Sequence, residues 1–311
     1  MIKSAHSNTL IVESIADLTQ RMQLPSPLHP LITLINYDIS TPTLTDIGRW
    51  IQLDFYKISF KNNFKGSVKY GPSSYDFKDG GLAFLSPGQI VEVPSQRADY
   101  QGYVLYFHSD LLKGYSLANH IFNFGYFDYG VTEALFLSDK EKQVIAALFQ
   151  AISVELNNPT DAFSQDILVS QLELLLNHSN RFYHRQFITR ELLNRNLIHR
   201  MNEYLQRYLT TGESIHQGLP SAQIIANNRN LSQRYLSDML RTLTGKTTQQ
   251  HIHLWLIDKA KQLLKQNTLA TSEIAYQLGF EHPQSFNKLF KQKTGLSPAM
   301  FKQNAQRSCT P

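Results

Sequence analysis

The chain has 311 residues, of which 42% are hydrophobic and 18% are charged, so its composition is that of a globular protein of about two domains and not of a disordered one. A single cysteine, Cys309, excludes a disulfide framework and any site built from several cysteines. No apolar run approaches the ~18 residues that a membrane span needs, and the first residues lack the apolar segment of a signal peptide, so we expect a cytoplasmic protein without membrane contact.

The net charge of +5 is unevenly distributed along the chain. Residues 1–184 hold 13 Lys+Arg and 18 Asp+Glu, a net charge of −5, whereas residues 185–311 hold 17 Lys+Arg and 7 Asp+Glu, a net charge of +10. This asymmetry predicts one domain over 1–184 and another over 185–311, and it is typical of a module that binds a polyanion. Ordinary solvated surfaces would give the same numbers, so charge alone leaves nucleic-acid binding open.

Short strand candidates, separated by Gly- and Pro-containing turns, occupy residues 30–110. Residues 50–60 are aromatic and β-branched with partial alternation, and turn signals lie at 78–81 and 86–89. This pattern predicts a small antiparallel barrel or sandwich. Aromatic side chains on these strands, with one histidine, are candidates for the wall of an effector pocket, although most of them would be expected simply to fill the core. They are Tyr56, Tyr70, Tyr75, Phe84, Tyr103, Tyr106 and His108.

Two helices are predicted after residue 138. Ser138 and Glu141 have the spacing of a capping box at the start of the first helix. The second helix covers 161–182 and carries an apolar stripe formed by Leu168, Leu172 and Leu175. Packing in the core explains this stripe, and so does a helix-to-helix contact between two copies of the chain.

Catalytic and metal sites have no clear signal. Six of the 11 histidines lie in residues 1–184, and no two of them stand at metal-ligand spacing. A Gly-rich phosphate loop and a convincing Ser/His/Asp set are also missing. We therefore predict no catalytic residue, no metal and no cofactor, and we expect His108 to be a structural or pocket histidine.

An internal repeat dominates residues 185–311. Residues 225–231 correspond to 274–280 at an offset of 49, and Thr244-Gly245 corresponds to Thr294-Gly295 at an offset of 50. Ser221 and Thr271 stand where helix N-caps belong, and Asn230 and Gly279 tolerate the positive φ of a sharp turn. Each copy therefore predicts a helix-turn-helix, and the uninterrupted segment 252–265 predicts a helix that joins the two copies.

The remaining face of each second helix is polar. Arg, Gln and Asn side chains can make paired bonds to base edges, and Lys reaches phosphates, so these residues are our candidates for DNA contact. In the first copy they are Gln233, Arg234, Ser237, Asp238 and Arg241, and in the second copy Gln284, Ser285, Asn287, Lys288 and Lys291. Asp238 has two alternative roles, either acceptance of a hydrogen bond from a cytosine amino group or an ion pair with Arg234 or Arg241.

The last hundred or so residues resemble the DNA-binding domain of AraC/XylS-type transcription regulators. The residues that carry the resemblance are 274–280, Ser285-Phe286, Phe290-Lys291, 294–298 and 259–264. The resemblance implies that the polar faces above meet the major groove. It extends more weakly to residues 1–184, for which it implies a cupin-like sensor barrel followed by dimerisation helices. The chain departs from the family pattern at Leu256, where an Arg is frequent, and at Phe301-Lys302, where Tyr-Arg is frequent.

The fold class expected is thus α+β, with an N-terminal cupin-like antiparallel barrel and dimerisation helices, and a C-terminal all-α domain with two helix-turn-helix units. Our leading hypothesis is a non-enzymatic, sequence-specific transcription regulator that binds double-stranded DNA and is controlled by a small-molecule effector in the barrel. A second copy of the chain and RNA polymerase are the further partners considered. A cupin-type enzyme with a helical accessory domain and a helical protein-interaction module remain as alternatives.

Overall fold

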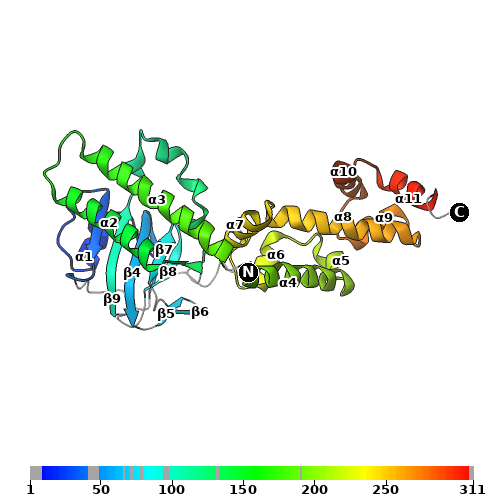
Figure 1. Cartoon of the computed structure of the whole chain (residues 1–311), viewed down its shortest axis with the longest axis horizontal. Coiled ribbons are helices and arrows are strands. Elements are labelled where there is room, and N and C mark those ends of the chain that lie inside the picture. Colours follow the sequence, from blue (N-terminus) through cyan, green and yellow to red (C-terminus); the bar gives the residue numbers. More distant parts are fainter. Residues whose placement is uncertain are drawn as a thin grey trace. The chain divides into compact units, whose positions relative to one another are not determined.

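The computed structural model describes residues 9–40, 49–65, 67–70, 73–76, 80–93, 99–130, 133–189 and 191–307. The chain divides into two compact units, Met1–Gln186 and Phe187–Pro311 (Figure 1). This division falls two residues after the boundary expected from the charge distribution. Among the described residues, no helix is long and apolar enough to cross a membrane.

The first unit contains two sheets and a hairpin. A three-stranded sheet has the order β1-β3-β8, and a five-stranded antiparallel sheet has the order β10-β7-β4-β9-β2. The strands are β1 Leu10–Val12, β2 Ile32–Asn36, β3 Trp50–Leu53, β4 Tyr56–Lys65, β5 Ser67–Tyr70, β6 Ser73–Asp76, β7 Gly81–Leu85, β8 Ile90–Glu92, β9 Asp99–Phe107 and β10 Leu135–Phe136. The mixed α+β class is confirmed. Among the described residues the two sheets share no strand and do not close, so the predicted cupin-like barrel is not confirmed.

Helices of the first unit cover both faces of the five-stranded sheet. They are α1 Ile15–Arg21, α2 Asp139–Asn157 and α3 Ser164–Thr189, with short 3-10 turns at Ser109–Leu112, Ser116–Asn119, Ile121–Asn123 and Gly125–Asp128. On one face, the rings of Phe60 and Tyr103 stack on Phe149 of α2, with centroids 5.8 and 5.5 Å apart. On the opposite face, Val104 and Tyr106 pack in one cluster with Ile15 of α1. Figure 1 shows α2 and α3 lying over the strands.

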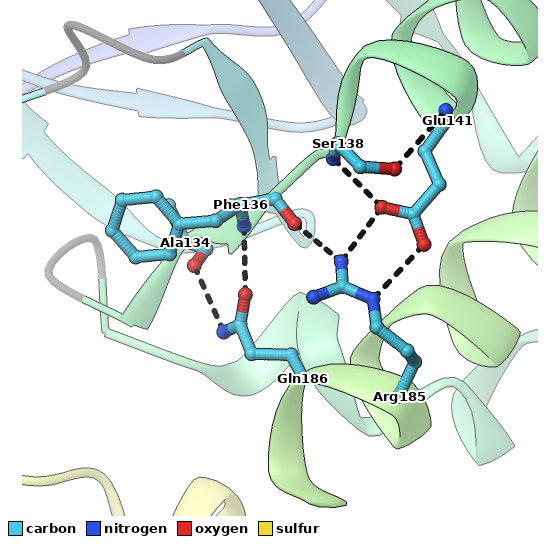
Figure 2. A network of polar contacts seen from close by, with 6 residues as sticks. All are labelled: Ala134, Phe136, Ser138, Glu141, Arg185 and Gln186. Atoms are coloured by element: carbon cyan, nitrogen blue, oxygen red, sulfur yellow. Dashed lines mark hydrogen bonds and ion pairs between the residues drawn. The ribbon is translucent and has the colours of Figure 1, made fainter. Parts of the chain in front are cut away.

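Polar contacts fix the junction between β10, α2 and the end of α3 (Figure 2). The predicted capping box is confirmed, because Glu141 accepts the Ser138 backbone N–H at 2.8 Å and donates its own N–H to the Ser138 hydroxyl. Arg185 donates two bonds to the Glu141 carboxylate, at 2.9 and 2.8 Å, and one to the Phe136 carbonyl at 2.7 Å. The side-chain amide of Gln186 accepts the Phe136 N–H of β10 at 2.8 Å and donates to the carbonyl of Ala134, just before the strand, at 3.3 Å, so it occupies the unpaired side of β10 as a further strand would.

The leucine stripe of α3 belongs to the core. Leu168, Leu172 and Leu175 are 2, 0 and 0% exposed within a single chain. A second copy could reach them only if the first unit opened, so the assignment of these three residues to a dimer contact is wrong. The apolar periodicity predicted the helix correctly, but its partner is the chain's own sheet layer.

The residues predicted to line an effector pocket do not face one cavity. Side chains alternate along a strand, and the register places Tyr56 opposite Phe107 and Phe60 opposite Tyr103 on the face that packs against α2. Phe84 also lies there, with its centroid 5.5 Å from that of Phe127, whereas Tyr106 lies on the other face. His108 caps a 3-10 turn, where its Nδ1 accepts the Asp110 N–H at 3.2 Å. The side chains of Tyr70 and Tyr75 lie outside the described residues.

The second unit is helical throughout its described residues. Its helices are α4 Glu191–Thr210, α5 Glu213–Gln217, α6 Ala222–Asn228, α7 Gln233–Thr244, α8 Thr248–Gln266, α9 Thr271–Gln277, α10 Pro283–Thr294 and α11 Pro298–Arg307. Helices α6 and α7 pack against the first part of α8, and α9 and α10 pack near its other end (Figure 1). The helix that the sequence predicts between the two repeats is therefore α8.

Candidate nucleic-acid interface

The first repeat folds as a helix-turn-helix formed by α6 and α7. The Ser221 hydroxyl accepts the Ile224 N–H at 3.2 Å and so caps α6, as predicted. Asn230 has φ +53° in the turn between the helices, and the Ser232 hydroxyl accepts the Tyr235 N–H at 3.2 Å and caps α7. Helix α7 ends at Gly245, which has φ +73°. Side-chain caps and a left-handed turn residue therefore set the limits of both helices.

The second repeat, α9 and α10, reproduces this geometry with different residues. Gly279 has φ +91° in the turn, Pro283 is the first residue of α10, and Gly295 ends that helix with φ +77°. The N-cap prediction for Thr271 is wrong by one position. The N-cap of α9 is Ala270, whose side chain cannot accept a hydrogen bond. The Glu273 carboxylate, in the first turn, accepts the Ala270 backbone N–H at 2.6 Å and so stabilises the start of the helix.

Within each copy, the two helices pack together through buried apolar residues at equivalent positions. Each residue in these sets is at most 1% exposed. They are Ile225, Ala226, Leu236 and Leu240 in the first copy, and Ile274, Ala275, Phe286 and Phe290 in the second. The small alanines let the two helices of each copy cross closely, and burial of one face leaves the opposite face of α7 and of α10 to solvent.

The joining helix α8 separates the two helix-turn-helix copies along its length. It has 19 residues, which at ~1.5 Å per residue gives about 28 Å. A capping box between Thr247 and Gln250 starts it, and Ile252, Ile257 and Leu264 are buried along it. Leu256, where family members frequently carry Arg, is 1% exposed and packs in the core, so this position cannot contact a phosphate in this chain.

The exposed face of α10 is positively charged and uncompensated. Gln284, Ser285, Asn287, Lys288 and Lys291 are all exposed. The helix contains no acidic residue, and among the described residues the side chains of these five have no hydrogen-bond or ion-pair partner. Lys293, which the sequence analysis did not select, adds a third lysine to the same helix. Five polar side chains are therefore available to an external ligand.

The exposed face of α7 differs, because its charges pair with each other. Arg234 Nε lies 3.0 Å from Asp238 Oδ2, and Arg241 lies 3.9 Å from Asp238 Oδ1. Of the two alternatives for Asp238, the structure therefore shows the ion pair. Gln233 is exposed and Ser237 is half-buried beside these charges. A base contact by Arg234 requires this pair to separate or to be shared with the base.

Contacts remote in sequence support the second turn. A Cβ at Gly279 would lie 2.6 Å from the carbonyl oxygen of Gly218, so the backbones touch at this point. The same Gly218 carbonyl accepts the Tyr208 hydroxyl at 3.1 Å, and the Ser214 hydroxyl donates to the Gln277 carbonyl at 2.8 Å. The only sign of this support in the sequence is a glycine that precedes the first repeat.

Two further polar contacts fix the ends of the exposed helices. Thr294 donates to the Phe290 carbonyl at 2.8 Å, and Thr244 donates to the Leu240 carbonyl at 2.7 Å. Lys302, where family members frequently carry Arg, donates to the Leu269 carbonyl at 3.0 Å.

Burial and the charge of Lys246 lower the pKa of His251, which also contacts Thr244. Among the described residues, no group of three or more His, Cys, Asp or Glu side chains could hold a metal ion.

Comparisons with known proteins match the region just described. A family model described as a helix-turn-helix domain matches residues 225–304. The transcriptional activator RhaR of Cronobacter sakazakii is 32% identical over 81 residues, 26% of this chain and 29% of that protein, and RhaR of Salmonella typhi is 34% identical over 77 residues, 25% and 27% of the two chains. The matched segment thus spans less than a third of these relatives.

The chain is also similar to solved structures. The C-terminal domain of the response regulator YesN from Fusobacterium nucleatum is 28% identical, covers 32% of this chain and 95% of that chain, and has a TM-score of 0.28. ToxT from Vibrio cholerae covers 87% of this chain and 96% of that chain at 14% identity, with a TM-score of 0.29. Scores of this size do not establish a shared arrangement of whole chains.

Proposed function

We propose that this chain, whose residues 225–304 form an AraC-type helix-turn-helix domain, is a transcription regulator that binds double-stranded DNA at specific sequences. The observation that carries the proposal is the pair of helix-turn-helix copies, each with an exposed polar helix. Both copies belong to the second unit, Phe187–Pro311, which has 16 Lys+Arg and 7 Asp+Glu and therefore a net charge of +9. A basic domain of this kind supplies the phosphate contacts on which DNA affinity depends.

Helix α10 reads base edges in the major groove. Gln284 and Asn287 carry amides that can donate to and accept from one base, the pattern that adenine presents there. Lys288 and Lys291 are exposed on the same helix and neutralise phosphates. Because these side chains have no partner among the described residues, α10 engages DNA without breaking an internal hydrogen bond or ion pair.

Helix α7 reads the second groove segment, with Gln233, Arg234, Ser237, Asp238 and Arg241 as its contact set. The ion pair between Arg234 and Asp238 fixes the direction of the guanidinium before DNA arrives. Asp238 is half-buried, so its carboxylate remains beside Arg234 in the complex and limits which base the guanidinium accepts. Two reading helices separated by about 28 Å of α8 suit groove segments that recur every ~34 Å on one face of the duplex.

The remaining parts of the proposal concern regulation. A small-molecule effector binds the first unit, RNA polymerase is a further partner, and the protein acts in the cytoplasm. Ile167 and Leu174 are 39 and 47% exposed on one face of α3, and Phe163, just before the helix, is 67% exposed. These three residues, and not the buried leucines, are the surface on which a second copy would pack. Sedimentation of the wild-type chain and of an Ile167→Glu, Leu174→Glu double variant tests that contact. We expect the mass of a dimer for the wild-type chain and the mass of a monomer for the double variant. Equal masses for the two proteins would contradict the proposed dimer contact. The comparisons lend no support to the enzyme alternative.

The test of DNA reading uses the full chain and a duplex recovered with it from a random pool. Gln284→Ala is expected to weaken binding to that duplex by about 1–3 kcal/mol and to leave binding to unrelated DNA nearly unchanged. The matched control is Gln143→Ala, an exposed glutamine on α2 of the first unit, which is expected to change neither affinity. Equal losses for the two variants, or equal losses on both DNAs, would contradict the proposal that α10 reads bases.

A further inference from the structure

A cavity of about 200 Å³ lies along the outer edge of strand β2 in the first unit. Strand β2 ends the five-stranded sheet and, among the described residues, pairs with β9 alone. The cavity is lined by residues 32–35 of β2, by the segment 24–28 after α1, and by Ser153, Leu156 and Asn157 at the end of α2. Consecutive strand residues point to opposite faces, so a cavity that touches 32–35 lies at the edge of the strand. Its volume exceeds the ~150 Å³ of a protein cavity that holds benzene, so it accepts a molecule larger than one aromatic ring.

The register of β2 fixes which of its backbone groups point to this edge. The His108 N–H donates to the Leu31 carbonyl at 2.8 Å, and the Tyr37 N–H donates to the Gly102 carbonyl at 2.9 Å. In an antiparallel pair, alternate residues direct their N–H and carbonyl to opposite sides of the strand. Odd-numbered residues of β2 therefore bond to β9, and Leu34 directs its N–H and its carbonyl to the cavity.

The backbone groups of Leu34 are open, in contrast to those of its neighbours on the same side. Ile32 is paired with His29 in an isolated antiparallel bridge, and the Asn36 carbonyl accepts the Ser40 N–H at 2.9 Å. Among the described residues, Leu34 has no such partner on this side, and it is only half-buried. The edge therefore offers one donor and one acceptor, the two groups with which a residue of a further strand would pair.

The opposite wall of the cavity does not supply that strand, and it carries no charge. Pro25 and Pro27 have no backbone N–H, and the Leu24 N–H already donates to the Thr19 carbonyl at 2.9 Å. Every described residue that lines the cavity is uncharged, and the polar side chains among them are hydroxyls and the amide of Asn157. A charged ligand would lose hydration there without gaining an ion pair, so the lining favours a neutral molecule.

We propose that this cavity binds a small neutral amide with an apolar side group, of the kind that a blocked amino acid provides. Its N–H donates to the Leu34 carbonyl and its carbonyl accepts the Leu34 N–H, as a residue of a neighbouring antiparallel strand would. Its apolar group packs against Leu24, Leu28 and Leu156, which line the same cavity. The assignment deepens the proposed function, on which it rests for its regulatory meaning: the amide is the effector that the first unit binds.

The experiment titrates the full chain by calorimetry with N-acetyl-leucinamide and three analogues. N-acetyl-glycinamide lacks the apolar group, the N-methylated leucinamide lacks the N–H donor, and N-acetyl-leucinate carries a negative charge. We expect N-acetyl-leucinamide to bind at least tenfold more tightly than each of the three. No binding of N-acetyl-leucinamide at millimolar concentration would overturn the proposal. Binding as tight for the N-methylated analogue would also overturn it, because the Leu34 carbonyl would then contribute nothing.

Two variants of the lining, each with a matched control, locate the site. Ser153→Phe fills the cavity from α2 and is expected to weaken amide binding at least tenfold, whereas Val154→Phe changes the next residue, 52% exposed and outside the lining, and is expected to leave binding unchanged. Leu28→Ala removes part of the apolar wall and is expected to weaken binding to a smaller extent, with Ile39→Ala as its control. Leu28 and Ile39 are 70 and 83% exposed, so neither change disturbs the core. Unchanged binding in Ser153→Phe and Leu28→Ala would overturn the assignment to this cavity.

A second measurement separates this inference from the proposed function. The affinity of the chain for its DNA duplex is determined with and without N-acetyl-leucinamide. A change in DNA affinity that disappears in the Ser153→Phe variant supports the effector role. If the amide binds but DNA affinity does not change, the effector role is overturned and the amide site stands. If the chain binds no DNA at all, the proposed function fails while calorimetry still decides the site.

Discussion

Replacement of Gly279 by Ala tests how the second helix-turn-helix is held. A Cβ at this position would lie 2.6 Å from the oxygen and 2.7 Å from the carbon of the Gly218 carbonyl, and 3.0 Å from the Leu219 nitrogen. All three are backbone atoms, which cannot rotate away as a side chain can. The matched control is Gly245→Ala, at the end of α7, where φ is +73° and a Cβ meets nothing within 4 Å.

The expected magnitudes follow from these two environments. A left-handed conformation costs an alanine about 1–2 kcal/mol, and the smaller freedom of the unfolded chain returns about 0.4–1 kcal/mol. Gly245→Ala should therefore destabilise the second unit by about 1 kcal/mol. Gly279→Ala carries the same cost and adds displacement of packed backbone, for which overpacking data suggest a further ~1–3 kcal/mol. A total of about 2–4 kcal/mol results.

Urea unfolding measures the difference. The chain has two tryptophans, Trp50 in the first unit and Trp255 in α8 of the second, so a Trp50→Phe background leaves one reporter of the second unit. The free energy of unfolding is obtained from the midpoint and slope of the Trp255 fluorescence transition. Losses for the two variants that agree within about 0.5 kcal/mol, the usual size of a surface effect, would refute the argument that the Gly218 contact governs this turn.

Three further predictions concern charge. Lys291→Ala should weaken binding to all duplexes alike and reduce the slope of log affinity against log salt by about 0.9, whereas Lys140→Ala should leave the slope unchanged; equal slopes in a salt titration would contradict the phosphate contact. Arg185→Met should lower the free energy of unfolding of the first unit, measured in urea, by about 2–3 kcal/mol, because Glu141, whose side chain is 13% exposed, loses its bidentate partner. A loss below about 0.5 kcal/mol, the usual size of a surface effect, would contradict this. Burial, together with the charge of Lys57, lowers the pKa of Lys61 from 10.5 to about 7 in the folded chain. Between these pH values the unfolded chain binds more protons than the folded one, so the free energy of unfolding rises with pH. Lys61→Met should remove this part of the rise in unfolding experiments between about pH 7 and 10.5, and an unchanged pH profile would contradict the prediction.

The second unit could be predicted from the sequence in most of its elements, because each signal was local. The repeat, the serine caps and the positive-φ turn residues act within a few positions of one another, and the structure places them as expected except at Thr271. That error arose because Glu273 caps the backbone of Ala270, a role for which the residue type of the N-cap gives no sign. The support of Gly279 by Gly218 joins residues 61 positions apart and has no local signal.

The first unit was harder to predict, because its errors concern partners and not elements. Tyr103 and Tyr106 are three apart on one strand and therefore lie on opposite faces, so they could not share a pocket wall. The stripe from Leu168 to Leu175 correctly indicated an amphipathic helix, but periodicity does not distinguish the chain's own sheet from a second copy. The lysines of β4 escaped notice because an isolated Lys in a strand reads as a solvated side chain until the register shows which face it occupies.

Selection of duplexes from a random pool by the purified full chain tests the central claim most directly. The account predicts enrichment of a motif with two conserved blocks whose centres lie about 10 base pairs apart, one for α10 and one for α7, and binding that falls steeply as salt is raised. Recovery of sequences with no motif, or with affinity indifferent to salt, would contradict the conclusion that the two helix-turn-helix copies read DNA.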